Sequence, residues 1–322
     1  MKILVTGGAG FLGQLLVAGL LKKAALPDAE DHPHEIDQII ALDQAPGLLA
    51  DPRVRYVSGD VSDGSLLSDL IDGTTGGVFH LAAVVSGTAE ADFNLGMRVN
   101  LGGTRGLLDA CRALPRPARI LFASSVAVFG GMLPEVVTDE TAPTPQTSYG
   151  VQKLIGELLV GEYSRKGFVD GRSVRIPTVS VRPGRPNGAA SSFASGIIRE
   201  PLAGIEAICP VEPETQIWLA SPRQVIASLV HAYELPATAW GVQRSLNLPG
   251  ITVRTGDMVD ALGLIAGPAV SQRIRWQPDA RIMTIVESWP ARIVTARAST
   301  MGFGRDTSIG AIIQEYIRSY AS

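Results

Sequence analysis

Apolar and polar positions follow a regular order through the first half of the chain. Short, nearly continuous apolar runs alternate with longer stretches in which apolar residues recur at helical spacing. The expected strands cover residues 3–6, 39–43, 55–58, 77–81 and 120–123. Strands that are apolar throughout are typical of a parallel sheet with helices on both faces. The pattern therefore predicts an α/β fold with a Rossmann-type doubly wound parallel sheet.

The pattern changes beyond Pro183, where glycine and proline become frequent and the alternation blurs. Residues 199–203 and 225–233 still indicate helices, and residues 245–248 a short strand. We therefore expect a sheet domain over residues 1–180. A smaller C-terminal α/β lobe is expected over residues 181–322, with part of it returning to the sheet.

The first expected strand runs directly into Thr-Gly-Gly-Ala-Gly-Phe-Leu-Gly, and a helical pattern follows. A glycine pattern between a strand and a helix is the context of a dinucleotide-binding site. Gly7 would form the tight turn, Gly10 would let the backbone approach a pyrophosphate, and Gly13 would allow close packing of helix and strand. The amide groups at the helix start, including those of Phe11 and Leu12, would then face the phosphates.

An acidic residue, Asp43, ends the second expected strand, where a carboxylate binds the ribose hydroxyls of a dinucleotide. The same carboxylate would repel the 2′-phosphate of NADP, so NAD is the predicted cofactor. The distance in sequence from the glycines exceeds the usual ~20 residues, because an insertion rich in proline, aspartate and histidine occupies residues 25–35. Alone, Asp43 would equally suit a turn at a strand end.

Further candidate cofactor contacts follow the third and fourth expected strands. Small or polar residues at these strand ends would let the backbone lie along the cofactor, although each of them also suits ordinary packing. They are Asp60, Val61, Leu81, Ala82 and Ala83.

Tyr149 and Lys153 are four residues apart in a helical pattern, so their side chains project from one face. A phenol beside an ammonium group can lose its proton near neutral pH and act as a general base. This spacing is common by chance and alone would indicate an amphipathic surface pair. The upstream glycine motif, together with Ser124 and Ser125 at the end of a strand, favours the catalytic interpretation.

Composition excludes several other classes of function. The net charge of −3 gives no basic surface for nucleic acid or anionic membrane. Cys111 and Cys209 have no paired spacing, and the four histidines show no metal-ligand spacing, so neither a disulfide framework nor a metal site is expected. The chain starts directly with a core strand and has no long apolar run, which favours a cytoplasmic location.

Together these motifs resemble the extended short-chain dehydrogenase/reductase family, also called the NAD-dependent epimerase/dehydratase family. The resemblance spans the first ~180 residues and continues more weakly to residue 250. It implies that Ser125, Tyr149 and Lys153 form the catalytic triad, with Lys153 also binding the nicotinamide ribose. Asn100 would support the site, and Pro177 and Thr178 would contact the cofactor. The family also implies a homodimer packed through helices near residues 101–112 and 149–164.

Two differences from relatives in the family narrow the range of reactions that this chain is expected to catalyse. Val126 and Ala127 replace the acidic pair that sugar-nucleotide dehydratases use to expel water, so dehydration lacks its acid. Arginine is the preferred bidentate ligand of a carboxylate, and several arginines follow the sheet domain. Each one alone also suits a salt bridge or a solvated surface, and the set would also suit a sugar-nucleotide diphosphate. The candidate substrate ligands are Ser86, Ser125, Tyr149, Arg182, Arg185, Arg199 and Arg223.

Three segments, residues 81–87, 124–130 and 182–191, are similar to those of the sugar-acid dehydrogenase branch of this family. That resemblance implies oxidation of the C2 hydroxyl of a small sugar acid, D-erythronate, to 2-oxo-tetronate. A nucleotide-sugar epimerase that retains NAD is the main alternative. A non-catalytic NAD-sensing regulator is less favoured, because such relatives usually lose the tyrosine or the lysine.

Overall fold

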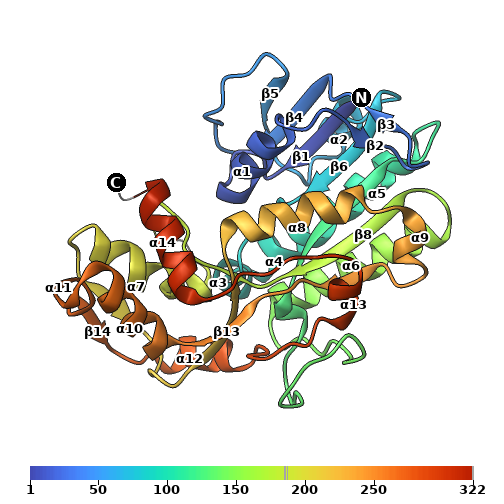
Figure 1. The fold of residues 1–322 in the computed structure, drawn as a ribbon. Coiled ribbons are helices and arrows are strands. Elements are labelled where there is room, and N and C mark those ends of the chain that lie inside the picture. The colour runs from blue at the N-terminus through green and yellow to red at the C-terminus, as the bar shows by residue number, and fades with distance from the viewer. Residues whose placement is uncertain (185, 187, 321–322) are drawn as a thin grey trace. The chain divides into compact units, whose positions relative to one another are not determined.

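The chain folds into two compact units, neither of which is continuous in sequence (Figure 1). The computed structural model describes residues 1–184, 186 and 188–320. Unit 1 comprises Met1–Ser125, Ser148–Arg175 and Ile226–Leu246. Unit 2 comprises Val126–Thr147, Ile176–Val225 and Asn247–Ser322.

A seven-stranded sheet forms the centre of unit 1, in the order β12-β8-β7-β6-β1-β4-β5. Its strands are β1 (Lys2–Thr6), β4 (Gln38–Asp43), β5 (Val54–Ser58), β6 (Thr75–His80), β7 (Arg119–Ser125), β8 (Asp170–Ile176) and β12 (Ser245–Asn247). The pairings of β5 with β4, β4 with β1, β1 with β6 and β6 with β7 are parallel. The predicted Rossmann-type α/β fold is confirmed, and each of the five strands expected in the first half is present.

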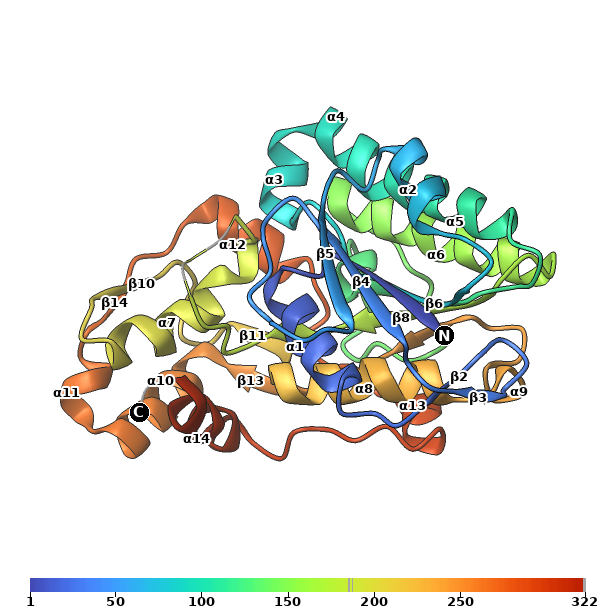
Figure 2. The ribbon, with the colours of Figure 1, turned by 90° about the horizontal axis from the view of Figure 1, so that it is seen from above.

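Helices cover both faces of this sheet, which is why its inner strands are apolar on both sides. Figure 2 shows α2, α5 and α6 on one face and α1 and α8 on the other. The bounds are α1 (Phe11–Leu20), α2 (Gly64–Leu70), α5 (Thr104–Arg112), α6 (Ser148–Arg165) and α8 (Pro222–Glu234). On the first face, Leu4, Val78 and Phe122 of the strands pack with Leu107 and Val160 of the helices.

The connection from β6 to α5 is helical but irregular. It contains α3 (Ser86–Ala91), α4 (Phe93–Gly96) and a π-helix, η1 (Met97–Gly103). Short π-helical turns are frequent at functional sites. This one carries Asn100, and the side chain of Asn100 is buried.

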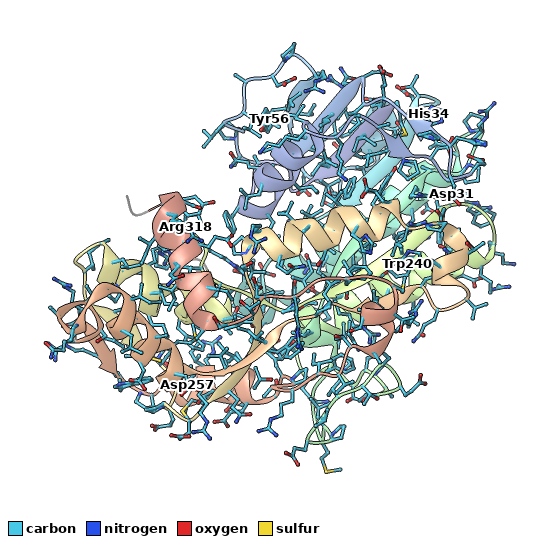
Figure 3. All side chains as sticks on the ribbon, in the orientation of Figure 1. Asp31, His34, Tyr56, Trp240, Asp257 and Arg318 are labelled. Carbon is cyan, nitrogen blue, oxygen red and sulfur yellow. The ribbon has the colours of Figure 1, made fainter. Side chains whose placement is uncertain are left out.

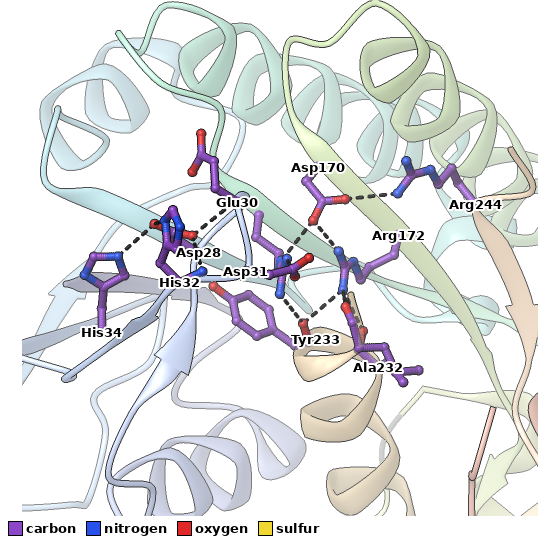
Figure 4. A network of polar contacts seen from close by, with 12 residues as sticks. Asp28, Glu30, Asp31, His32, His34, Asp170, Arg172, Ala232, Tyr233 and Arg244 are labelled. Atoms are coloured by element: carbon purple, nitrogen blue, oxygen red, sulfur yellow. Dashed lines mark hydrogen bonds and ion pairs between the residues drawn. The ribbon is translucent and has the colours of Figure 1, made fainter. Parts of the chain in front are cut away.

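The insertion at residues 25–35 forms a small hairpin of β2 (Leu26–Pro27) and β3 (Pro33–His34). Its tip is tied to the sheet, because Arg119 Nη2 donates to Asp31 Oδ1 at 2.5 Å. The carboxylate of Asp28 accepts from His34 at 2.7 Å and from the backbone amides of Glu30 and His32 (Figure 4). Asp31 and His34 of this hairpin are labelled in Figure 3. The insertion is therefore an ordered part of unit 1.

Beside this hairpin, three arginines surround one carboxylate at the amino ends of β7 and β8. Asp170 accepts from Arg119 at 2.9 Å, from Arg244 at 3.0 Å and also from Arg172 (Figure 4). Arg119 and Arg172 also donate to carbonyl groups at the carboxyl end of α8, among them that of Tyr233. Buried cations thus meet both a carboxylate and the negative end of a helix dipole.

Unit 2 is built around smaller sheets. Strand β11 (Gln216–Ala220) pairs in parallel with β9 (Thr178–Val179) and antiparallel with β13 (Ile251–Arg254), and β10 (Ala207–Cys209) pairs with β14 (Ile274–Trp276). The helices include α7 (Phe193–Leu202), α10 (Thr255–Ala266), α11 (Pro268–Ser271), α12 (Ala280–Glu287), α13 (Ala296–Thr300) and α14 (Ile309–Tyr320). Apolar residues of these elements form a separate core that includes Ile197, Leu219, Met258 and Ile313.

Within the described ranges, no helix combines the length and apolar character needed to cross a membrane.

Candidate active site

The turn between β1 and α1 depends on two glycines that no larger residue could replace without movement of the backbone. Gly7 has a φ of 71°, and a Cβ there would lie 2.8 Å from the amide nitrogen of Ala82. A Cβ on Gly13 would lie 2.0 Å from the carbonyl oxygen of Gly7. A Cβ on Gly10 would meet that oxygen at 3.2 Å, so Gly10 is less constrained by the protein itself. This pattern is expected if Gly10 is kept small for a ligand.

The start of α1 fits the pyrophosphate of a dinucleotide. The helix begins at Phe11 with Gly10 as its N-cap and without a side-chain cap. In the described structure the amides of Phe11, Leu12 and Gly13 have no hydrogen-bond acceptor from the protein. Three unsatisfied donors at the positive end of a helix dipole suit an anion. Together with the glycine turn, this geometry accommodates NAD.

Asp43, the last residue of β4, lies against the same turn. Its Oδ2 accepts from the amides of Ala9 at 3.1 Å and Gly10 at 3.0 Å, and its Oδ1 accepts from Ala45 at 3.2 Å. The carboxylate is only partly buried, so its oxygens can accept further bonds from the ribose hydroxyls of a cofactor. Asp43 thus also orders the glycine turn, a role that its position in the sequence does not reveal.

The other predicted cofactor contacts lie at the carboxyl ends of β5 and β6. Asp60 accepts from the amide and the hydroxyl of Ser62, each at 2.8 Å, and the hydrogen bond from the Ser62 amide is the main cause that lowers the pKa of Asp60. Val61 is buried next to Gly103 of η1. The amide of Ala82 donates to the hydroxyl of Thr6 at 3.2 Å. This bond fixes the segment formed by Leu81, Ala82 and Ala83 beside the glycine turn.

Asn100 joins this segment to α6. Its Oδ1 accepts from the amide of Val84 at 2.7 Å, and its Nδ2 donates to the carbonyl of Val84 at 3.1 Å and to Oε1 of Gln152 at 2.7 Å. The predicted supporting residue therefore clamps a backbone segment rather than projecting freely into a pocket. Gln152 lies next to Lys153 in sequence, and no sequence motif indicates that it takes part in this joint.

The three predicted catalytic residues lie on two neighbouring elements of unit 1. Ser125 is the last residue of β7, and Tyr149 and Lys153 lie in the first two turns of α6. Lys153 Nζ donates to the carbonyl of Ala123 at 2.8 Å and lies 5.7 Å from the centre of the Tyr149 ring. Helix α6 packs on β7. The strand end and the helix therefore bring these residues to one edge of the sheet.

Burial strongly affects Lys153, which is only 3% exposed to solvent. Desolvation lowers its pKa from 10.5 to about 7, and the negative charge of Glu157 opposes that shift. The ammonium form is therefore sensitive to nearby charges in the neutral pH range.

A buried ionic cluster adjoins Lys153, and the sequence alone does not reveal it. Ser124 Oγ donates to Glu157 at 2.5 Å, and Arg175 donates to both oxygens of Glu157, at 2.7 Å in the shortest contact. Ser124 is buried and its hydroxyl is already bonded to Glu157, which favours Ser125 over Ser124 as the serine of the triad. The only signal in the sequence was the spacing of Tyr149, Lys153 and Glu157.

The candidate substrate arginines belong to unit 2, except that Arg185 lies outside the described residues. Arg182 donates from its amide to Ser195 at 3.0 Å and from Nε to the carbonyl of Val179 at 3.2 Å. Arg199 is buried and donates to the carbonyl of Arg182 at 2.8 Å and to Glu200 at 2.5 Å. The structure therefore brings Arg182 and Arg199 together on one side of unit 2.

The remaining candidate substrate and cofactor residues each have their own surroundings. Arg223 pairs with Glu315 at 2.8 Å, and its side chain is 68% exposed. Thr178 is buried in β9, directly after Pro177. Ser86 is the first residue of α3 in unit 1. The described residues hold no group of three histidine, cysteine or acidic side chains that could bind a metal ion.

Comparison with known proteins identifies the family. The model of the "NAD dependent epimerase/dehydratase family" matches residues 3–218. The chain belongs to this family. The resemblance inferred from the glycine motif and from Tyr149 and Lys153 is thus confirmed, and so is NAD as the cofactor.

Two curated relatives match over almost their whole length. D-erythronate dehydrogenase of Cupriavidus necator is 55% identical over 98% of this chain and 98% of its own length. D-erythronate dehydrogenase of Haemophilus influenzae is 44% identical over 98% of this chain and 99% of its own. Both are members of the sugar-acid branch that the sequence resembles.

Two solved structures show the same fold. A nucleoside-diphosphate-sugar epimerase from Agrobacterium tumefaciens has a TM-score of 0.92 and 39% identity, covering 99% of this chain and 94% of that one. L-threonine 3-dehydrogenase from Trypanosoma brucei has a TM-score of 0.86 and 25% identity, covering 98% and 95%. The fold thus serves both epimerases and dehydrogenases, and the site must distinguish them.

Proposed function

We propose that this chain is an NAD-dependent dehydrogenase that oxidises the C2 hydroxyl of D-erythronate to 2-oxo-tetronate. Two relatives with this activity in their names align with nearly the whole chain. The structural observation that carries the proposal is the position of Lys153, which is buried against the end of β7 and 5.7 Å from the Tyr149 ring. This arrangement suits a phenolate acting as a general base on an alcohol.

Bound NAD would accept the hydride that leaves C2. In the protein, the ammonium of Lys153 stabilises the phenolate of Tyr149, and this phenolate takes the proton of the C2 hydroxyl and becomes a neutral phenol. Ser125 donates a hydrogen bond to the same substrate oxygen as negative charge develops on it. The loop after β6, fixed by Asn100, keeps its backbone close to the cofactor.

The two parts of the chain divide these tasks in our proposal. Residues 1–180 bind NAD, with the helix start at Phe11 holding the pyrophosphate and Asp43 the adenosine ribose. Residues 181–322 mainly hold the substrate, and Arg182 is the leading candidate for its carboxylate. Arg199 supports Arg182 through the backbone contact between them. The other proposed cofactor contacts are Gly7, Gly10, Leu12, Gly13, Asp60, Val61, Leu81, Ala82, Ala83, Asn100, Tyr149, Lys153, Pro177 and Thr178.

The variant Tyr149→Phe tests this function. We expect the kcat for oxidation of D-erythronate to fall by at least about 100-fold, because the general base is lost, while NAD binding measured by calorimetry changes little. Tyr163→Phe, in the same helix and bonded to Asp109 rather than to the site, is the matched control. An undiminished rate in the Tyr149 variant would contradict the proposed mechanism.

A nucleotide-sugar epimerase is the second candidate, favoured by the similarity to the Agrobacterium tumefaciens structure named for that activity. An epimerase returns its hydride, so no free NADH accumulates. Absorbance of NADH should rise with D-erythronate under our proposal. Conversion of a UDP-sugar without net NAD reduction would favour the epimerase instead.

We further propose that the enzyme is a cytoplasmic homodimer. The exposed side of α6 carries Leu158 and Val151, which are 65% and 40% exposed, and apolar side chains on a helix surface suit a partner helix. Light scattering at micromolar concentration should give twice the mass of one chain. The variant Leu158→Glu should shift the mass toward the monomer.

A further inference from the structure

Three ionisable side chains follow one another along one face of α6. Tyr149, Lys153 and Glu157 are spaced by four residues, which places them one helical turn apart on the same side. Lys153 is 3% exposed and Glu157 is 4% exposed. A buried carboxylate is costly unless it meets positive groups and hydrogen-bond donors.

Glu157 is fully engaged by two strands of the sheet. At the end of β7, Ser124 Oγ donates to its Oε1 at 2.5 Å. At the end of β8, Arg175 forms a bidentate pair with it, with Nε at 2.9 Å from Oε1 and Nη2 at 2.7 Å from Oε2. These bonds fix both the carboxylate and the strand that carries Ser125.

Lys153 is bound to the same stretch of β7 by its contact with the carbonyl of Ala123. Two consecutive residues, Ala123 and Ser124, are thus held by Lys153 and Glu157 of α6. The register between the catalytic helix and the catalytic strand depends on this double attachment. Removal of the Glu157 carboxylate would weaken the attachment of α6 to β7, and the position of Lys153 depends on that attachment.

Four ionisable side chains determine the electrostatic surroundings of Lys153, and one of them is a carboxylate. Tyr149 and Glu157 lie one turn from Lys153 on α6. His80 of β6 interacts with the charge of Lys153, and Arg175 of β8 binds Glu157. His80 is neutral, because burial first and the charge of Lys153 second lower its pKa to about 3. Arg175 pairs directly with the carboxylate of Glu157, so its positive charge offsets part of the negative charge that acts on Lys153. The charge of Glu157 favours the ammonium form of Lys153.

We propose that Glu157 is a positioning residue that holds Lys153 as an ammonium ion beside Tyr149, and that Arg175 limits this effect by pairing with the same carboxylate. This inference rests on the proposed function, in which the Lys153 cation stabilises the Tyr149 phenolate. It adds a fourth, indirectly acting residue to the site.

The test follows the titration of Lys153 directly. The sequence contains five lysines, so labelling with [13Cε]-lysine gives few resonances, and the spectrum of Lys153→Met assigns the one of interest. The protein is titrated without substrate, so the result does not depend on which substrate is correct. The kcat/KM for D-erythronate is then measured over the same pH range.

In Glu157→Gln, the resonance of Lys153 should titrate at least about one pH unit lower, because an opposite charge has been removed. In Arg175→Gln it should titrate higher, because a competing cation has been removed. The alkaline limb of kcat/KM should move in the same direction as the titration in each variant. Glu162→Gln, an exposed ion pair with Arg165 in the same helix, should leave both readouts unchanged.

An unchanged Lys153 titration in folded Glu157→Gln would overturn the proposal and leave Glu157 a purely structural role. Circular dichroism shows whether each variant is folded. If Glu157→Gln does not fold, Arg175→Gln carries the test, and a titration that is unchanged or lowered there contradicts the proposal. A failure of Tyr149→Phe to lose activity would instead contradict the proposed function and would leave the Lys153 titration unaffected.

Discussion

His80 Nε2 donates a hydrogen bond to Thr104 Oγ1 at 2.9 Å, deep in unit 1. The direction of this bond follows from the neighbours. The hydroxyl of Thr104 gives its own proton to the carbonyl of Asn100 at 2.6 Å and can therefore only accept from the imidazole. On the other side, Nδ1 accepts from Thr6 Oγ1 at 2.6 Å. The imidazole is thus neutral, with its proton on Nε2.

We expect His80 to make the protein less stable in acid. Its pKa in the folded protein is lowered from 6.5 to about 3, mainly by burial, so between these values the unfolded chain binds the proton and the folded chain does not. Stability from this group is complete above pH 6.5 and falls toward lower pH with a slope of about 1.4 kcal/mol per pH unit. Urea unfolding of His80→Gln should show a weaker pH dependence in this window.

His32→Gln is the control for that measurement, because the side chain of His32 is 74% exposed. It should keep the pH dependence of the parent. An acid dependence that is equal in His80→Gln and in the parent would show that other groups cause it.

Gly10→Ala and Gly13→Ala should separate cofactor binding from folding. A Cβ at position 13 would collide with the Gly7 carbonyl at 2.0 Å, so we expect lower thermal stability and no measurable NAD binding. At position 10 the nearest protein atom is 3.2 Å away, so stability should be nearly retained while NAD affinity falls by about 10-fold or more. Differential scanning fluorimetry and calorimetric titration measure the two effects. Gly161→Ala, with open space around the new Cβ, should bind NAD normally.

Asp170→Asn should destabilise the protein far more than Asp31→Asn. Asp170 serves three arginines in the interior, and loss of its charge leaves buried cations uncompensated, which costs about 3–5 kcal/mol. The side chain of Asp31 is 42% exposed at the hairpin tip, so its loss should cost less than about 1 kcal/mol. Chemical unfolding at neutral pH tests this order. Equal losses in the two variants would show that the buried cluster has no special weight.

Arg182→Met and Arg223→Met should differ in their effect on substrate affinity. Arg223 already pairs with Glu315 on α14, whereas Arg182 is held near Arg199 by backbone contacts. We expect the KM for D-erythronate to rise by about 10-fold or more in Arg182→Met, because a charged hydrogen bond to the carboxylate is lost. In Arg223→Met the KM should stay near that of the parent. Steady-state kinetics at saturating NAD decide the question, and the reverse order would make Arg223 the carboxylate ligand.

The features that the sequence predicted well are those encoded within short segments. Neighbouring residues and a single periodicity of apolar positions are enough to predict three features. These are the glycine turn, the strand that ends in Asp43, and the helix that carries Tyr149 and Lys153. Strand β8 escaped notice because buried arginines, among them Arg172, interrupt its apolar pattern. These arginines are tolerated only because Asp170 and the end of α8 accept from them, which is a property of the tertiary structure.

The ionic cluster at Glu157 was beyond prediction for a related reason. Its members come from β7, α6 and β8, and no spacing links Ser124 to Arg175. A single sequence shows an acidic residue in a helix, which usually faces solvent. Only the packing of α6 on the sheet shows that this carboxylate is buried.

The clamp formed by Asn100 has a consequence for how this protein can change. One amide side chain holds both the backbone at Val84 and the side chain of Gln152, the neighbour of Lys153. A mutation that tilts the helix would drag the loop with it, so coenzyme affinity and turnover would shift together. Adaptation to a different sugar acid is therefore easier through the separate lobe, where Arg182 and Arg199 are placed, than through this shared joint.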